Sequence, residues 1–162
     1  RGPEAVQGGE QAAEGGAVTS AYLAGPMRSI KEFNFPAFRR ATKILRDRGW
    51  EIISPHEMDE AAGYDWSGFT GHEDLAEFNF NLTERLTEDI HAIGAMDAVI
   101  LLDGWSNSSG ARAEASFAWA VGKPVYLFEE GNRINGFTNR LLPISKGLLI
   151  SIACGDPVEW EG

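Results

Sequence analysis

Residues 97–128 read DAVILLDGWSNSSGARAEASFAWAVGKPVYLF, a pattern that predicts a strand, a loop, a helix and a second strand. The apolar run at 98–102 does not alternate with polar residues, which is typical of a parallel strand covered on both faces. A loop rich in small and hydroxyl side chains follows at 105–110 and leads into a helix over 111–121. The Gly122-Lys123-Pro124 turn ends this helix, and residues 125–128 begin the next strand.

Glu114 is the chemically unusual residue of this unit. We expect it in the first turn of an alanine-rich helix, where its side chain points back towards the loop at 105–110. Such a loop at a helix N-terminus can hold a phosphate, a sugar hydroxyl or a carboxylate, because backbone amides point at the ligand. A first-turn glutamate can also simply complement the helix dipole. Spacing alone gives these two roles roughly even odds.

Length and charge limit the classes of protein to consider. The 162 residues fit one domain with a sizeable core. A net charge of −10 argues against a general DNA or RNA binder, because affinity for the phosphate backbone requires a basic face. The single cysteine, Cys154, excludes an internal disulfide and suits a reducing compartment. No apolar run approaches the roughly 20 residues that cross a bilayer and no secretory signal is recognisable, so we expect no membrane partner and a cytoplasmic location.

The chain before residue 97 predicts a tail and the first half of the domain. Residues 1–17 have almost no core-forming side chain and predict a flexible tail, with the domain at 18–162. A strand at 18–24 ends in a glycine-containing loop that lacks both G-x-G-x-x-G and a Walker A motif, so a conventional dehydrogenase or P-loop enzyme is disfavoured. Arg28 in this loop could bind a 5'-phosphate through two hydrogen bonds. It could equally be a solvated surface arginine.

The remaining segments complete the expected fold. We expect a helix from Asn34, as its cap, to Arg48, then a short strand at 50–55. A second helix at 83–95 should place Leu82, Leu86, Ile90 and Ile93 against the sheet. After residue 128 we expect a short helical segment up to residue 142 and a last strand at 148–152. Together these elements predict a single Rossmann-like, doubly wound α/β domain with a parallel sheet of about five strands.

Between these elements lies an insert, residues 56–81, in which helical or strand periodicity breaks down. A long irregular segment inside a small domain is usually a lid or a partner-binding surface, and we expect it to cover the site. Its aromatic side chains could stack on a base, or pack against the domain or a second subunit. The three histidines show no metal-ligand spacing, so we predict no metal and no cofactor.

Several of these residues together resemble the superfamily of nucleoside 2-deoxyribosyltransferases and deoxynucleoside 5'-monophosphate N-glycosidases. The resemblance covers about residues 22–128, and Gly25-Pro26-Met27 matches a phage and bacterial deoxyribosyltransferase-like branch. It implies that Glu114 is the nucleophile and that Asp89, eight residues before Asp97, transfers a proton to the leaving base. It also implies a homo-oligomer. The motif consists of Asp89, Asp97, Ser108-x-Gly110-x-x-x-Glu114 and Gly122-Lys123-Pro124.

The chemistry of N-glycosidic cleavage explains these roles. Positive charge builds on the sugar, and a carboxylate below the anomeric carbon can trap it as a glycosyl ester. A second carboxyl group protonates the departing base if its pKa is raised. Asp103 could bind the substrate or form a turn, and Trp105 could stack on a base or cap the core. The expected substrate-binding residues are Tyr22, Gly25, Pro26, Met27, Arg28, Asp103, Trp105, Ser106, Ser108, Ser109 and Gly110.

The sequence therefore favours an enzyme whose partner is a small molecule, a deoxynucleoside or its 5'-monophosphate, and not a nucleic-acid polymer. Arg28 and the serine-rich loop favour the monophosphate and hydrolysis slightly. Transfer of the deoxyribosyl group to a second base is the main alternative, since pocket closure decides which acceptor reacts. A non-catalytic nucleotide-binding sensor and an NAD-glycohydrolase remain further alternatives.

Overall fold

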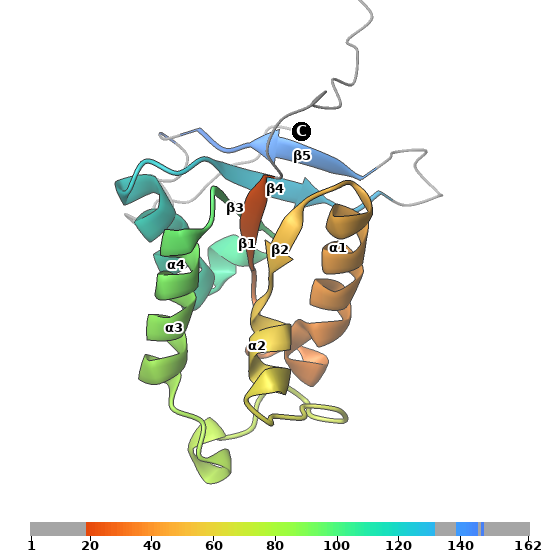
Figure 1. Ribbon diagram of the computed structural model, residues 1–162. Helices are drawn as coiled ribbons and strands as arrows, with labels where there is room; N and C mark the ends of the chain where they lie inside the picture. Colours follow the sequence, from red (N-terminus) through yellow and green to blue (C-terminus); the bar gives the residue numbers. More distant parts are fainter. Residues whose placement is uncertain (1–18, 132–138, 146, 148–162) are drawn as a thin grey trace, which may run out of the picture.

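The computed structural model describes residues 19–131, 139–145 and 147. They form one five-stranded sheet with helices on both faces (Figure 1). The strands are β1 (Ser20–Ala24), β2 (Glu51–Ile53), β3 (Ala98–Leu101), β4 (Val125–Glu129) and β5 (Arg140–Pro143). The helices are α1 (Phe35–Asp47), α2 (Pro55–Ala61), α3 (Leu82–Ala95) and α4 (Ser109–Ala120), with short 3-10 turns η1 (Lys31–Asn34), η2 (Leu75–Phe78) and η3 (Trp105–Asn107).

The sheet has the order β2-β1-β3-β4-β5, and its first four strands are parallel. The expected Rossmann-like α/β architecture is therefore confirmed, but the sheet is not wholly parallel. Strand β5 runs antiparallel to β4, with Leu141 and Leu142 opposite Phe128 and Leu127. The connection at 130–139 is shorter than the dozen or so residues that a parallel crossover needs. The prediction of a short helical segment up to residue 142 is therefore wrong at residues 140–142, which belong to β5. The strand predicted at 148–152 lies outside the described residues.

Each face of the sheet has its own core. Helix α1 packs on one face, where Phe38 and Leu45 are fully buried against side chains of β1 and β3. Helices α3 and α4 pack on the opposite face, where Ile93 and three alanines of α4 are buried. Figure 1 shows α1 on one side of the strands and α3 and α4 on the other. The alternating side chains of β1 and β3 contribute to both cores, which explains why these strands are apolar throughout.

Two residues of the motif join these elements together. The Asp97 carboxylate, just before β3, accepts hydrogen bonds from the backbone N–H and hydroxyl of Ser20 at 2.9 and 2.8 Å. The Lys123 ammonium, in the turn before β4, donates to the carbonyl of Met96 at the end of α3. Both contacts lie at the end of the sheet where β1 and β3 begin, so these two residues position strands and helices.

The helix boundaries differ from expectation in ways that matter for the site. Helix α4 begins at Ser109, because the Ser108 hydroxyl caps it by accepting from Ala111 N at 3.3 Å. Glu114 consequently lies in the second turn of the helix. Asn34 occupies the N-cap position of α1, as expected, but its side chain makes no capping hydrogen bond; its amide donates instead to the Pro26 carbonyl at 2.8 Å. Leu82 is 54% exposed, since it opens α3 where the helix extends beyond the sheet.

The insert is more regular than its sequence indicates. Residues 56–61 belong to α2, which Pro55 opens at a position where proline is well tolerated. The segment from Gly63 to Asn81 contains only the short turn η2. Four buried side chains of the η1 region and the insert form a third apolar cluster of their own: Phe33, Phe35, Trp66 and Leu75.

Candidate active site

A cleft of about 920 Å³ opens at the carboxyl ends of β1, β3 and β4. Its walls come from the loops after these strands and from α2, α3 and α4. Ligands of open α/β sheets bind at this edge, where neighbouring crossovers leave the sheet in opposite directions. The sequence-predicted residues that line the cleft are Gly25, Pro26, Met27, Arg28, Asp89, Asp103, Ser108, Ser109, Gly110 and Glu114.

The loop after β1 passes close to the sheet because Gly25 has no side chain. A Cβ on Gly25 would lie 2.9 Å from the Cβ of Leu102, closer than real Cβ atoms approach. Beyond it the backbone adopts left-handed conformations at Ser29 and at residues 32–34, which cost energy in non-glycine residues. Two hydrogen bonds to the insert, from Ser29 N to Gly71 O and from Glu32 N to Phe69 O, hold this conformation. Arg28 is exposed at the rim of the cleft.

The loop after β3 presents only part of its polar surface to the cleft. Asp103 lines the cleft and also accepts from the backbone N–H of Gly104 at 2.9 Å, so it forms a turn as well. Trp105 is 3% exposed and packs in the core beside α4. Neither Trp105 nor Ser106 lines the cleft. Trp105 therefore takes the core position that was one of its two expected roles, because η3 turns the indole towards the sheet. Ser106, expected to bind substrate, lies outside the residues that line the cleft.

Three side chains meet at the floor of the cleft. Glu114 is 6% exposed, and its carboxyl accepts a hydrogen bond from the Tyr22 hydroxyl at 3.4 Å. Asp89, which comes from the neighbouring helix α3, also interacts with the Tyr22 phenol. Tyr22 itself is fully buried in β1. It therefore does not line the cleft as a substrate-binding residue but supports the two carboxyl groups from below.

Burial raises the pKa of both carboxyl groups. Desolvation, and then the charge of Asp89, raise the pKa of Glu114 to about 8. Desolvation also raises the pKa of Asp89 to about 6, although the Tyr22 hydrogen bond opposes the rise. Burial and the same two carboxylates raise the pKa of Tyr22 well above its usual value, so its hydroxyl remains a donor. Two carboxyl groups this close hold one proton between them near neutral pH.

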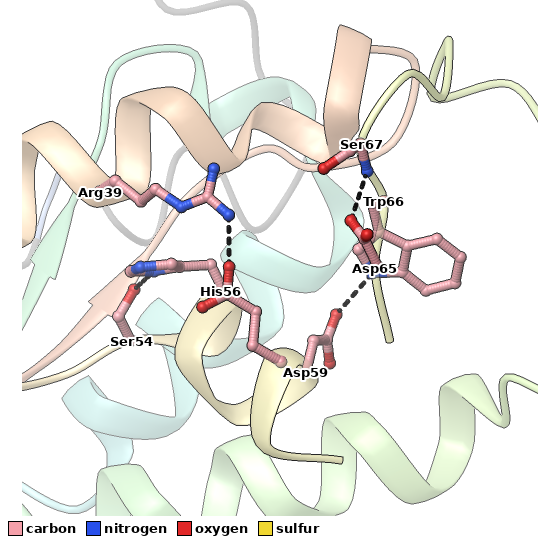
Figure 2. Close-up of polar contacts among 8 residues, drawn as sticks. Arg39, Ser54, His56, Asp59, Asp65, Trp66 and Ser67 are labelled. Atoms are coloured by element: carbon pink, nitrogen blue, oxygen red, sulfur yellow. Dashed lines mark hydrogen bonds and ion pairs between the residues drawn. The ribbon is translucent and has the colours of Figure 1, made fainter. Parts of the chain in front are cut away.

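A third buried carboxyl group, Asp59 of α2, lines the same cleft and was missed from the sequence. It is 4% exposed, and its Oδ2 accepts from the Trp66 indole N–H at 3.2 Å. Its Oδ1 lies 3.9 Å from a guanidinium nitrogen of Arg85 on α3. Desolvation raises the pKa of Asp59 to about 6, against the Trp66 hydrogen bond and the Arg85 charge. Figure 2 shows Trp66 reaching from the insert down to Asp59.

His56, also in α2, has a structural environment. Its Nδ1 lies 2.6 Å from the Ser54 hydroxyl (Figure 2). Its ring packs edge-on against Phe35. Burial lowers the pKa of His56, which favours the neutral imidazole. In the part of the chain that the structure describes, no group of three or more histidine, cysteine or acidic side chains could hold a metal ion.

The aromatic residues of the insert pack mainly on one another. Trp66 stacks on Tyr64 with ring centroids 5.3 Å apart, and Phe33, Phe69 and Phe80 surround it. Among these rings only Phe80 lines the cleft. Most insert aromatics therefore pack on one another away from the cleft, and one forms part of its wall.

Residues 19–127 match the family model described as a domain of unknown function, DUF4406. The chain belongs to the DUF4406 family. The DUF4406 match runs from β1 into β4, so it includes all the residues that line the cleft except Phe128 and Glu130. No curated protein matches the chain significantly. Within the described residues of this DUF4406 domain, no helix is both long and apolar enough to cross a bilayer.

Proposed function

We propose that this DUF4406 protein cleaves the N-glycosidic bond of a 2'-deoxynucleoside 5'-monophosphate by hydrolysis. The observation that carries the proposal is the pair Glu114 and Asp89, two carboxyl groups with raised pKa that share the Tyr22 hydroxyl at the floor of a cleft. Perturbed acids in a cleft mark candidate catalytic sites. The motif resemblance to deoxyribosyltransferases and N-glycosidases supports the same roles for the same two residues.

Glu114 is the proposed nucleophile. As the bond to the base breaks, the sugar becomes cationic, and a buried carboxylate stabilises that charge strongly because little water screens it. Glu114 Oε1 then bonds to the anomeric carbon, and the departing base takes the bonding electrons and a proton. Tyr22 fixes the orientation of the carboxyl group through its hydrogen bond.

Asp89 is the proposed acid and base. The two groups hold one proton between them, and without substrate the higher pKa of Glu114 places the proton there. A sugar with developing positive charge favours ionised Glu114, so the proton is then held by Asp89 and can pass to the base. Ionised Asp89 subsequently removes a proton from the water that attacks the glycosyl ester. The Tyr22 hydroxyl, which contacts both groups, lies between them.

The phosphate belongs at the rim of the cleft. The floor carries carboxyl groups that repel an anion, whereas Arg28 and the start of α4 lie at the rim. Backbone amides at a helix N-terminus and a guanidinium group are both suited to a phosphate. Ser109 is exposed there, and the adjacent Gly110 backbone is approachable because it has no side chain.

The test is release of free base from a panel of deoxynucleosides and their 5'-monophosphates, with and without an acceptor base. We expect release from monophosphates without acceptor, and a loss of at least about a thousandfold in Glu114→Gln, as for other catalytic groups. Asp89→Asn should also lose activity, whereas Glu77→Gln, an exposed residue of η2, should not. Turnover that survives in Glu114→Gln would contradict the proposal. Release only with acceptor would make the protein a transferase, and equal binding without turnover would make it a sensor.

A further inference from the structure

The proposed reaction leaves the buried carboxyl group of Asp59 without a role. Burying a carboxyl group is costly unless its oxygens find partners. One oxygen has a partner in the Trp66 indole N–H at 3.2 Å, whereas the other lies 3.9 Å from Arg85, beyond hydrogen-bond distance. Asp59 and Arg85 both line the cleft (Figure 2 shows Asp59). This second oxygen is an acceptor with room for a ligand.

The position of Asp59 relative to the reacting groups indicates which part of the substrate it meets. Asp59 lies beside Arg85, 3.9 Å from its guanidinium group, and Asp89 is one helical turn further along α3 on the same side of the helix. Glu114 lies next to Asp89 at the floor of the cleft, where it accepts from Tyr22. The three carboxyl groups therefore follow one another in the order Asp59, Asp89, Glu114. With the sugar at Glu114 and the base beside Asp89, which protonates it, the far edge of the base lies against Asp59. Phe80 and Leu86 line the cleft as apolar surfaces for the faces of the ring.

The chemistry around Asp59 favours one kind of base edge. Asp59 supplies a carboxylate oxygen as an acceptor, while the cation beside it, Arg85, already pairs with Glu88. An exocyclic amino group donates to such a surface, whereas a carbonyl oxygen at the same place would face a carboxylate. We propose that Asp59 is a specificity-determining residue that selects bases with an exocyclic amino group, such as cytosine or adenine, over their oxo counterparts. This proposal rests on the proposed function.

The test compares pairs of substrates that differ only in this substituent: the deoxynucleoside monophosphates of cytosine and uracil, and of adenine and hypoxanthine. A buried polar group left opposite the wrong partner costs about 1–3 kcal/mol. We therefore expect wild type to prefer the amino substrate in kcat/KM by about tenfold to a hundredfold. In Asp59→Asn the amide oxygen can keep the Trp66 hydrogen bond while the NH₂ group replaces the free acceptor. The preference should then fall below one.

Wild type at different pH gives a second measurement that does not depend on a variant. The pKa of Asp59 is raised to about 6, so lowering the pH through 6 turns the acceptor into a donor and should reduce the amino-to-oxo ratio. Glu88 and Asp89 on α3, Arg85 beside them and the Trp66 indole face Asp59. Asp59→Asn keeps all of these groups, so it is the control for their contribution to the ratio. In Asp59→Asn the ratio should be independent of pH.

Affinity measured by calorimetry in a Glu114→Gln background separates this proposal from catalysis. Tighter binding of the amino nucleotide, reversed by adding Asp59→Asn, would support the role of Asp59. If wild type then turned over no substrate, that absence of turnover would overturn the proposed reaction and leave the role of Asp59 standing. Equal affinity for both members of each pair, or a preference that Asp59→Asn leaves unchanged, overturns the role of Asp59 even if base release is rapid. Urea denaturation of each variant checks that it is folded.

Discussion

Replacing Glu114 with glutamine should stabilise the protein, by an amount that increases with pH. In the folded state the pKa of Glu114 is raised from 4.5 to about 8, chiefly by burial. Because the folded state binds the proton more tightly than the unfolded chain, the stability of wild type decreases as pH rises from 4.5 towards 8. A glutamine side chain at this position has no proton to lose, so the variant escapes this decrease.

The magnitude follows from the change in pKa. A rise from 4.5 to about 8 corresponds to about 5 kcal/mol at roughly 1.4 kcal/mol per pKa unit. The carboxyl group is almost completely buried, so solvent screening reduces this value little. We expect Glu114→Gln to exceed wild type in unfolding free energy by only about 1 kcal/mol at pH 5, and by up to about 5 kcal/mol above pH 8.

Urea denaturation of wild type and variant at half-unit steps from pH 5 to 9 measures this difference directly. Glu77→Gln is the matched control, because Glu77 is exposed and water solvates its charge in both states. Its unfolding free energy should follow that of wild type at every pH. A difference between Glu114→Gln and wild type that stays constant from pH 5 to 9 would refute the reasoning, since it would show that Glu114 ionises as easily in the folded protein as in water.

Two further predictions concern packing around the site. Gly25→Ala should lower the free energy of unfolding by about 1–3 kcal/mol and weaken nucleotide binding, because the new Cβ would lie 2.9 Å from Leu102 Cβ. Gly94→Ala in α3 is the control, because a Cβ there meets nothing within 4 Å. It should be neutral or stabilise the protein by up to about 1 kcal/mol. Thr42→Val should stabilise the protein by about 1 kcal/mol in urea denaturation, because the buried Thr42 hydroxyl has no hydrogen-bond partner within the described structure. Thr87→Val removes an exposed hydroxyl bonded to its own helix, so a gain equal to that of Thr42→Val would contradict the explanation.

The architecture could be predicted because it depends on patterns within short segments. The unbroken apolar runs of β1 and β3 identify central parallel strands, and the glycines at 49 and 122 mark where two helices end. The direction of β5 could not be predicted in the same way, because Leu141 and Leu142 suit a strand or a helix equally. Their pairing with β4 decides between the two.

The site could be predicted only where a motif or helical position pointed to it. Glu114 of α4 and Asp89 of α3 come from two helices on the same face of the sheet and meet in one cleft. Asp59 could not be distinguished from the other acidic residues of the insert, because its burial depends on how the irregular part of the insert folds back to place Trp66 beside it and on Arg85 of α3. The indole of Trp105 turned inwards for a similar reason, since its surroundings come from α4 and the sheet.

The third apolar cluster, formed by Phe33, Phe35, Trp66 and Leu75, shares no buried residue with the cores on the two faces of the sheet. Substitutions in separate clusters have nearly additive effects on stability. Side chains packed in this cluster can therefore change during evolution with little effect on the strand that carries Tyr22 or on the helices that carry Glu114 and Asp89. The insert and the two cores of the sheet can vary separately because different apolar clusters support them.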